Sequence, residues 1–277
     1  MDLGEGAAST RDLRELLVGY RSQRKRRLEV PSVVELEGFR GEAARDLGAA
    51  AHDQAAVLGL KDEEYPARLR SIDDPPLILF IKGDPSCLQG GNPIAVVGTR
   101  TPTGYGLGKG FAIGSYLAQK GLVVVSGLAR GCDTAAHRGC LKGRGRTVAV
   151  LPSGFKAIYP EENRDLAEEI RLNRGCLVSE YPPGEKPQKH YFIERDRIQS
   201  GLCDGVLVIE TMVEDGTMHT VGFALSQGRK LAALGHPPDL ASHPAARGNQ
   251  KLISEGVALP IGNERDLERF LQAAGSR

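Results

Sequence analysis

Short, continuous apolar runs alternate with longer mixed segments from residue 93 onward. The apolar runs are residues 94–98, 122–127, 147–154, 176–183, 205–211 and 230–237. The helices expected between and after them are 106–120, about 133–142, 159–173, 194–203, 217–228 and a closing helix in 263–277. Strands that are apolar on both faces are typical of a covered parallel sheet, joined by right-handed crossovers. The pattern predicts an α/β fold: an extended Rossmann-like, doubly wound, mostly parallel sheet with helices on both faces.

The chain before this alternation has a different character. Residues 1–60 are rich in alanine and leucine, and we expect a short helical N-terminal segment there. The basic run RSQRKRR at 21–27 is either a solvated helix face or an auxiliary phosphate contact. Residues 61–277 are expected to form the Rossmann-like domain. It is entered through 65–84, where an Asp-Pro-Pro sequence forces an extended turn before a strand.

Composition limits the functions that this fold could carry. A formal net charge of +1 over 277 residues is low for a protein that binds nucleic acid over its whole surface, so any anion site must be local. The five cysteines are scattered and form no C-x-x-C, which indicates free thiols in a reducing cytoplasm and no zinc site. No apolar run reaches 18 residues, so no transmembrane helix is expected.

The loops that follow the apolar runs are rich in glycine, hydroxyl groups and basic residues. They are GTRTPTGYG, SGLARGCD, LPSGFKAIYP, EYPPGEKPQKHYFIERDR and TMVEDGTMHT. Loops that leave the carboxyl ends of parallel strands meet at one edge of the sheet. Glycine lets a phosphate approach the backbone, and helix N-termini supply N–H donors, so this edge is a candidate anion site.

The first of these loops fits neither standard nucleotide template. In TGYGLGKG, Thr103 stands where a Walker A loop has its first glycine, and Gly110 stands where it has Ser or Thr. The dinucleotide fingerprint G-x-G-x-x-G fails as well, because its third glycine would be Lys109 or Phe111. We therefore expect neither ATP hydrolysis nor NAD binding, and no cofactor.

Three groups of residues allow a catalytic interpretation beside a structural one. Cys132 and His137 could form a nucleophilic pair, whereas the intervening Asp133 is expected to cap the helix that it opens. His219 could be a general acid, although a packed or capping histidine is the simpler interpretation. The carboxylates that end two apolar runs, Glu180 and Glu210, could face each other on adjacent strands or could serve only as structural hydrogen-bond acceptors.

Six segments occur in an order and at a spacing that resemble one protein family. They are YPARLRSIDDPPLILFIKGD, IAVVGTR, SGLARGCDTAAHRGCL, GRTVAVLPSGFKAIYPEENRDLAEEI, LVSEYPPGEKP and RDRIQSGLCDGVLVIE. Together they make the chain, over about residues 61–260, similar to the DNA-processing protein A family (DprA, also called Smf). The resemblance implies an extended Rossmann fold without catalytic activity that binds single-stranded DNA, usually as a dimer. It also implies a role in loading a RecA-type recombinase onto incoming DNA during natural transformation.

The resemblance also implies which residues contact DNA. The arginine of the G-[ST]-R motif, here Arg100, is a principal phosphate contact, and the K-x-x-F motif places a phosphate contact at Lys189 and a base-stacking ring at Phe192. The full set expected at the DNA is Gly98, Thr99, Arg100, Gly127, Arg130, Gly131, Ser153, Gly154, Lys189, Phe192, Arg195, Arg197, Gly216 and Thr217. Single-strand sites of this kind combine cations with stacking rings and tolerate any sequence.

This chain departs from the family pattern at several positions. Ile193 stands in place of a proline and Asp196 in place of an asparagine, and the loop 214–220 adds Glu214 and Asp215. The three acids add negative charge near the expected phosphate track. They leave open a second hypothesis, in which the chain binds a nucleotide or cleaves the glycosidic bond of a nucleoside monophosphate. Arg100 could likewise pair with Glu180 or Asp215 and only brace the loops.

Overall fold

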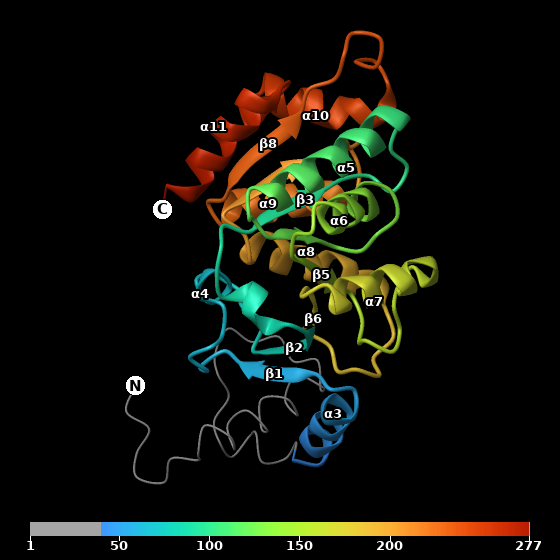
Figure 1. The fold of residues 1–277 in the computed structure, drawn as a ribbon, viewed down its shortest axis with the longest axis vertical. Helices are drawn as coiled ribbons and strands as arrows, with labels where there is room; N and C mark the ends of the chain where they lie inside the picture. Colours follow the sequence, from blue (N-terminus) through green and yellow to red (C-terminus); the bar gives the residue numbers. More distant parts are fainter. Residues whose placement is uncertain (1–39, 277) are drawn as a thin grey trace.

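The structure is a computed structural model that describes residues 40–276 (Figure 1). Over these residues the chain forms a nine-stranded sheet. In spatial order its strands are β1 (Ala56–Gly59), β2 (Ile78–Gly83), β6 (Cys176–Ser179), β5 (Thr147–Leu151), β4 (Val124–Ser126), β3 (Ile94–Val97), β7 (Gly205–Val208), β8 (Lys230–Leu234) and β9 (Leu259–Ile261). The pairings from β6 to β9 are all parallel, whereas β2 pairs antiparallel with both β1 and β6. The predicted mostly parallel α/β sheet is confirmed.

Helices cover both faces of the sheet, as the continuous apolar strands predict. One face packs against α3 (Arg40–His52), α5 (Gly104–Gln119), α6 (Cys132–Lys142), α7 (Arg164–Leu172) and α11 (Glu264–Gly275). The other face packs against α4 (Ala67–Arg70), α8 (Lys189–Gly201), α9 (Thr217–Ser226) and α10 (Pro244–Ser254). Successive strand residues divide between the two layers: Val96 is buried with α5 and α6, and Val97 with α8 and α9.

Several elements differ from the expectation. Ala56–Gly59 lies in the segment expected to be helical but forms β1, because it pairs antiparallel with β2 along its whole length. Short 3-10 turns cover Pro85–Leu88 and Glu161–Asn163, so the expected helix 159–173 becomes a 3-10 turn followed by α7. The helix expected at 194–203 begins earlier, at Lys189, and α10 and β9 were not predicted. The basic run 21–27 lies outside the described residues.

The order of the strands fixes where a ligand can bind. From β3 the chain moves outward through β4, β5 and β6, and it then returns across the sheet to place β7 on the other side of β3. In such sheets ligands bind outside the carboxyl ends of the strands at this reversal. No helix in the part of the chain described here is long and apolar enough to cross a membrane.

Candidate functional site

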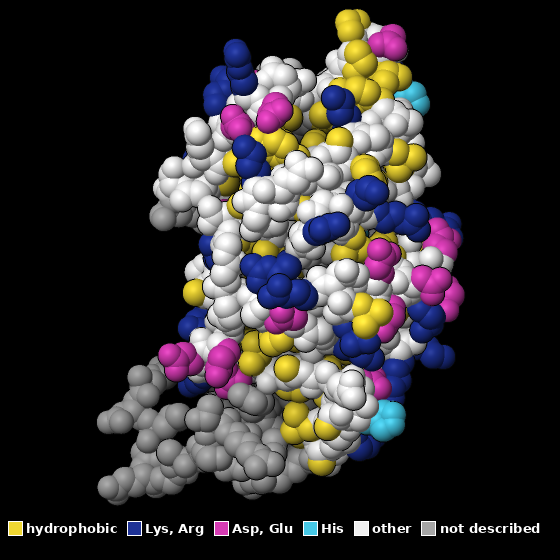
Figure 2. Space-filling view, viewed as in Figure 1, with side chains coloured by type: hydrophobic (Ala, Val, Ile, Leu, Met, Phe, Trp, Pro, Cys, Tyr) yellow, Lys and Arg dark blue, Asp and Glu magenta, His cyan; other side chains and the backbone are white. Residues whose placement is uncertain are grey.

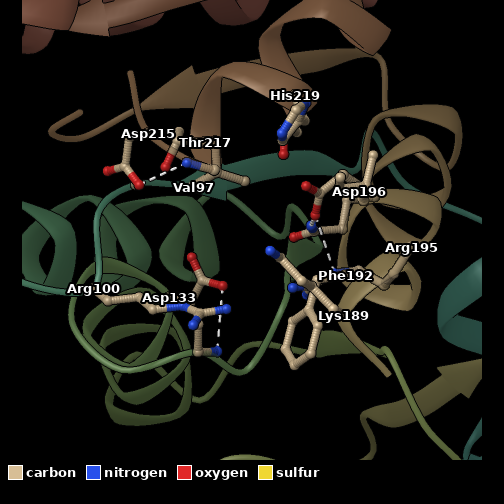
Figure 3. Close-up of a pocket in the computed structure, with 16 residues that line it drawn as sticks. Val97, Arg100, Asp133, Lys189, Phe192, Arg195, Asp196, Asp215, Thr217 and His219 are labelled. Atoms are coloured by element: carbon tan, nitrogen blue, oxygen red, sulfur yellow. Dashed lines mark hydrogen bonds and ion pairs between the residues drawn. The ribbon is translucent and has the colours of Figure 1, made fainter. Parts of the chain in front are cut away.

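A pocket of about 310 Å³ opens at the carboxyl ends of β3, β4 and β7, beside the reversal of the strand order. Its walls come from the loops after β3 and β4, from α8, and from the loop that leads into α9 (Figure 3). The lining residues are Val97, Gly98, Arg100, Ala129, Asp133, Lys189, Phe192, Ile193, Arg195, Asp196, Gln199, Asp215, Gly216, Thr217, His219 and Thr220. The pocket therefore joins segments from more than half of the domain's length.

Two cations and an aromatic ring line one side of the pocket. The guanidinium of Arg100 lies over the ring of Phe192, with its central carbon 5.2 Å from the ring centre. That ring makes an edge contact with Tyr159, with ring centres 5.3 Å apart. Figure 3 shows Arg100 and Lys189 extending toward the space between them from opposite sides. Arg100 is exposed and forms no ion pair with any residue that the structure describes, so it does not pair with Glu180 or Asp215.

The inner part of the pocket contains buried acids. Asp133 accepts hydrogen bonds from the backbone N–H of Gly127 at 3.1 Å and of Ala129 at 3.3 Å. Asp133 therefore holds the loop after β4. We had expected it to cap α6, and this expectation was wrong, because no side chain caps that helix. Burial raises the pKa of Asp133 above its usual range, and the nearby Arg195 opposes this effect.

Asp196 and Arg195 form a buried ion pair beside Asp133. The distance from Arg195 Nε to Asp196 Oδ1 is 3.1 Å, and the two side chains are 6% and 10% exposed. Burial raises the pKa of Asp196 to about 6; Arg195 opposes this shift, and the charge of Asp133 adds to it. Arg195 also donates from Nη1 to the carbonyl of Val150 at 2.9 Å. A side chain at Gly127 would occupy the same space, since its Cβ would lie 1.6 Å from Arg195 Nη1.

The glycine-rich loop after β3 is organised around a carboxylate of the protein. Glu210, fully buried, accepts hydrogen bonds from the backbone N–H and the Oγ1 of Thr103, both at 2.7 Å. His236 Nε2 lies 3.1 Å from Glu210 Oε1. Burial favours a raised pKa, but these hydrogen bonds outweigh it and hold the pKa of Glu210 below its usual range. A Cβ at Gly106 would lie 2.3 Å from the Glu210 carboxyl carbon, so this glycine admits the carboxylate.

Groups of the protein itself thus take hydrogen-bond donors at the N-terminus of α5. The capping Thr103, whose Oγ1 accepts from the backbone N–H of Gly106 at 3.1 Å, is itself held by Glu210. A phosphate cannot take the place that the glycine pattern suggested for it, directly at this helix end. Gly98 has a similar packing role, because its Cβ would lie 2.6 Å from Cys132 Sγ. The exposed Arg100 of this loop remains open to a ligand.

The structure divides the residues that we expected at the DNA into three groups. Those that line the pocket are Gly98, Arg100, Lys189, Phe192, Arg195, Gly216 and Thr217. Those that pack around its lining are Thr99, Gly127 and Gly131. Those placed elsewhere are Arg130, Ser153, Gly154 and Arg197. Three of the five basic residues expected to converge on this edge therefore meet at the pocket.

The four residues placed elsewhere have other partners. Arg197 is buried in an ion pair with Glu180, with two N–O distances of 2.9 Å. Burial alone would lower the pKa of Arg197, but its pairing with Glu180 outweighs this and raises it. Arg130 is exposed and pairs with Glu162. Of the remaining two, Ser153 donates to the carbonyl of Ala157 at 2.7 Å, and a Cβ at Gly154 would lie 2.0 Å from the carbonyl oxygen of Pro182.

Glu180 and Glu210 do not form a carboxylate pair. They follow β6 and β7, and we had expected these strands to be adjacent, but β5, β4 and β3 lie between them. Each carboxylate is held by its own partners, Glu180 by Arg197 and Glu210 by Thr103 and His236. The structural interpretation of both acids is therefore the correct one.

The other catalytic candidates also have defined environments. Cys132 is fully buried, and burial raises the pKa of its thiol. His137 is equally buried, its Nδ1 lies 2.7 Å from Thr147 Oγ1, and burial together with Arg195 lowers its pKa to about 3. They form no reactive pair. His219 is exposed and lines the pocket instead of packing or capping α9.

Some pocket residues could not be recognised from the sequence. Gln199 is such a residue: it lines the pocket, but no loop motif marks it, because α8 reaches the site only through the long crossover from β6 to β7. Within the described residues, no group of three His, Cys, Asp or Glu side chains is arranged to hold a metal ion. Figure 2 shows basic and acidic side chains interspersed over one face of the molecule, so cations concentrate only locally there.

Comparisons with known proteins agree with this architecture. Residues 56–272 match the family model described as DNA recombination-mediator protein A. The DNA processing protein DprA of Bacillus subtilis is 40% identical over 223 residues, which cover 80% of this chain and 74% of that protein. Protein Smf of Escherichia coli is 38% identical over 214 residues, or 77% of this chain and 56% of that protein.

Two solved structures are similar over most of the chain. The X-ray structure of DNA processing protein A from Streptococcus pneumoniae has a TM-score of 0.74 at 27% identity, and the match covers 95% of this chain and 93% of that one. The protein of the same name from Helicobacter pylori, whose structure is described as revealing a unique single-stranded DNA binding mode, has a TM-score of 0.70 at 28% identity. That match covers 80% of this chain and 96% of the other.

Proposed function

This chain belongs to the DNA recombination-mediator protein A family, and from that premise we propose that it binds single-stranded DNA at the pocket described above. The observation that carries the proposal is the arrangement of Arg100, Lys189 and Phe192 at one open site. Arg100 is exposed and has no acidic partner among the described residues, so its charge is available to a phosphate. An arginine can make two parallel hydrogen bonds to a phosphate, which a lysine cannot reproduce.

The aromatic ring favours the binding of single-stranded DNA over duplex DNA. Phe192 is partly exposed between Arg100 and Tyr159, and a base can stack on it only if the base has left its own stack. Phosphate contacts and stacking on Phe192 do not depend on base sequence, so their contribution to affinity rests on strand type and salt concentration.

We extend the proposal to the cellular role that the family suggests. The protein protects incoming single-stranded DNA and helps to load a RecA-type recombinase in natural transformation and recombination. It acts in the cytoplasm, as a homodimer and without catalysis. The alternative of a nucleotide-cleaving enzyme drew on the acidic loop 214–220 and on Glu180 and Glu210. These two carboxylates are engaged away from the pocket.

Fluorescence anisotropy with an oligo-dT of about 20 nucleotides and a duplex of matched length tests the proposal, since this length exceeds the usual site size. We expect clear preference for the single strand at the same salt concentration. Phe192→Ala should cost about 1–3 kcal/mol of binding free energy, the usual scale for one base–aromatic stack. Phe111→Ala is the matched control, because Phe111 is 40% exposed on α5 and does not line the pocket. Equal affinity for duplex and single strand would overturn the proposal.

A further inference from the structure

The inner part of the pocket presents mainly hydrogen-bond acceptors. Asp133, Asp196, Gln199 and Asp215 line it together. Two of their oxygen atoms, Gln199 Oε1 and Asp215 Oδ2, are buried and have no hydrogen-bond partner among the residues that the structure describes. A buried acceptor without a donor is costly, so these atoms are suited to a ligand that brings N–H groups.

Asp196 is the best placed of these acceptors. Its Oδ1 accepts from Gln199 Nε2 at 2.8 Å and pairs with Arg195, whereas no hydrogen bond to Oδ2 occurs within the described part of the chain. Figure 3 places its carboxylate between His219 and Lys189, on the side of the pocket formed by α8. Gln199 follows three residues later on the same helix, so the free carboxylate oxygen and the orphan amide oxygen belong to one surface.

The cations of the pocket do not cancel this character. Arg195 already donates to the carbonyl of Val150 and pairs with Asp196. Arg100 lies over the Phe192 ring, and Figure 3 shows Lys189 beside that ring. A nucleotide can therefore place its phosphate near Arg100 and Lys189 and direct the polar edge of its base toward the acids.

Resting on the proposed function, we propose that this inner surface selects a guanine base from the bound strand. Guanine carries two adjacent donors, its N1–H and its 2-amino group, one for each of the two acceptors left open among the described residues, Asp196 Oδ2 and Gln199 Oε1. Thymine offers one N–H between two carbonyl oxygens, which would face Asp196 and Gln199 unfavourably. Adenine and cytosine each offer an amino group beside a ring acceptor, so they rank between the two. The cavity, about 310 Å³, is at the small end of the range for ligand pockets and suits one base.

Competition binding with four oligonucleotides tests this selection. The reference is oligo-dT, and the others carry guanine, inosine or adenine at every fourth position. Isolated guanines avoid quadruplex formation, and the strand can slide until one enters the pocket. We expect guanine to strengthen binding to the wild-type protein about tenfold over oligo-dT, the scale of one bidentate base contact. Inosine lacks the 2-amino group and should lose most of that gain.

Asp196→Asn should reduce the ratio of guanine-strand to thymine-strand affinity to about one. Asp165→Asn is the matched control, because it removes an equal charge from an exposed position on α7. A lost charge acts on all strands alike, so the ratio is the decisive readout. Equal binding of guanine, inosine and thymine strands by the wild-type protein would overturn the inference and leave the proposed function standing. The inosine comparison needs no variant, so it decides the question even if Asp196→Asn does not fold. Absence of binding to every strand would instead refute the proposed function itself.

Discussion

Arg197 and Arg100 were both expected at the DNA, and the structure predicts opposite consequences for their removal. Arg197 is 4% exposed, and its guanidinium holds Glu180, which is 6% exposed, through two contacts of 2.9 Å. Its Nε also donates to the carbonyl of Asp74 at 2.9 Å. Replacing Arg197 with methionine keeps much of the side-chain volume but removes the guanidinium that pairs with the buried Glu180 carboxylate. Breaking a buried pair in this way costs about 3–5 kcal/mol of unfolding free energy.

Urea unfolding and oligo-dT binding on the same preparations separate the two roles. For Arg197→Met we expect a loss of about 3–5 kcal/mol in unfolding free energy. The dissociation constant of the folded variant for oligo-dT should stay within about twofold of that of wild type. The double variant Arg197→Met, Glu180→Gln should be more stable than the single variant, because a neutral amide then replaces the buried carboxylate that has lost its guanidinium. Arg138→Met is the control, since Arg138 is exposed on α6. Unchanged stability with a large loss of DNA affinity would refute this reasoning.

Two further substitutions test the interior of the site. Gly106→Ala should destabilise the protein by about 1–3 kcal/mol, because its Cβ would overlap the buried Glu210 carboxylate, whereas Gly104→Ala has no atom within 4 Å and should not; equal melting temperatures for the two variants would contradict this. Asp196, with a pKa of about 6 against an ordinary 3.8, binds its proton more tightly in the folded state, so wild type should lose about 3 kcal/mol relative to Asp196→Asn as the pH rises from about 4 to about 6. Above about pH 6 the difference in unfolding free energy between the two proteins should stay constant. Urea unfolding of both proteins between about pH 4 and about pH 6 measures it. A difference that does not change with pH would disprove the raised pKa.

The parallel sheet could be predicted because its strands are short and apolar on both faces. β1 and β9 could not, since each is an edge strand whose existence depends on its neighbour: Ala56–Gly59 pairs with β2, and Leu259–Ile261 pairs with β8. The sequence also did not reveal which strands are neighbours in the sheet. The return of the chain from β6 to β7 placed three strands between Glu180 and Glu210.

The site shows a similar division between what the sequence reveals and what it conceals. Arg100, Lys189 and Phe192 could be identified from their motifs, and they meet at the pocket. Arg195 and Arg197 could not both face the same edge, because residues two apart on a helix point in nearly opposite directions. The helix predicted at 194–203 already included both arginines, so this difference in direction was visible in the sequence.

The glycines of the loop after β3 suggested a phosphate site at the start of α5, and this prediction failed for a physical reason. A glycine admits any close neighbour, and the sequence does not say whether that neighbour is a ligand or the protein. At Gly106 it is the carboxylate of Glu210, more than 100 positions later in the chain. The Glu210 carboxylate accepts from the N–H of Thr103, and Thr103 Oγ1 accepts from the N–H of Gly106, so these two donors are not open to a phosphate.

The salt dependence of oligo-dT binding by wild type and Arg100→Ala tests most directly whether Arg100 holds a phosphate. The plot of log affinity against log salt concentration should be flatter for the variant by about 0.7, the value for one lost phosphate contact on a single strand. Its melting temperature should match that of wild type, because Arg100 is exposed and forms no ion pair within the described residues. An unaltered slope together with a lowered melting temperature would show that Arg100 only braces the loops, and would contradict the account.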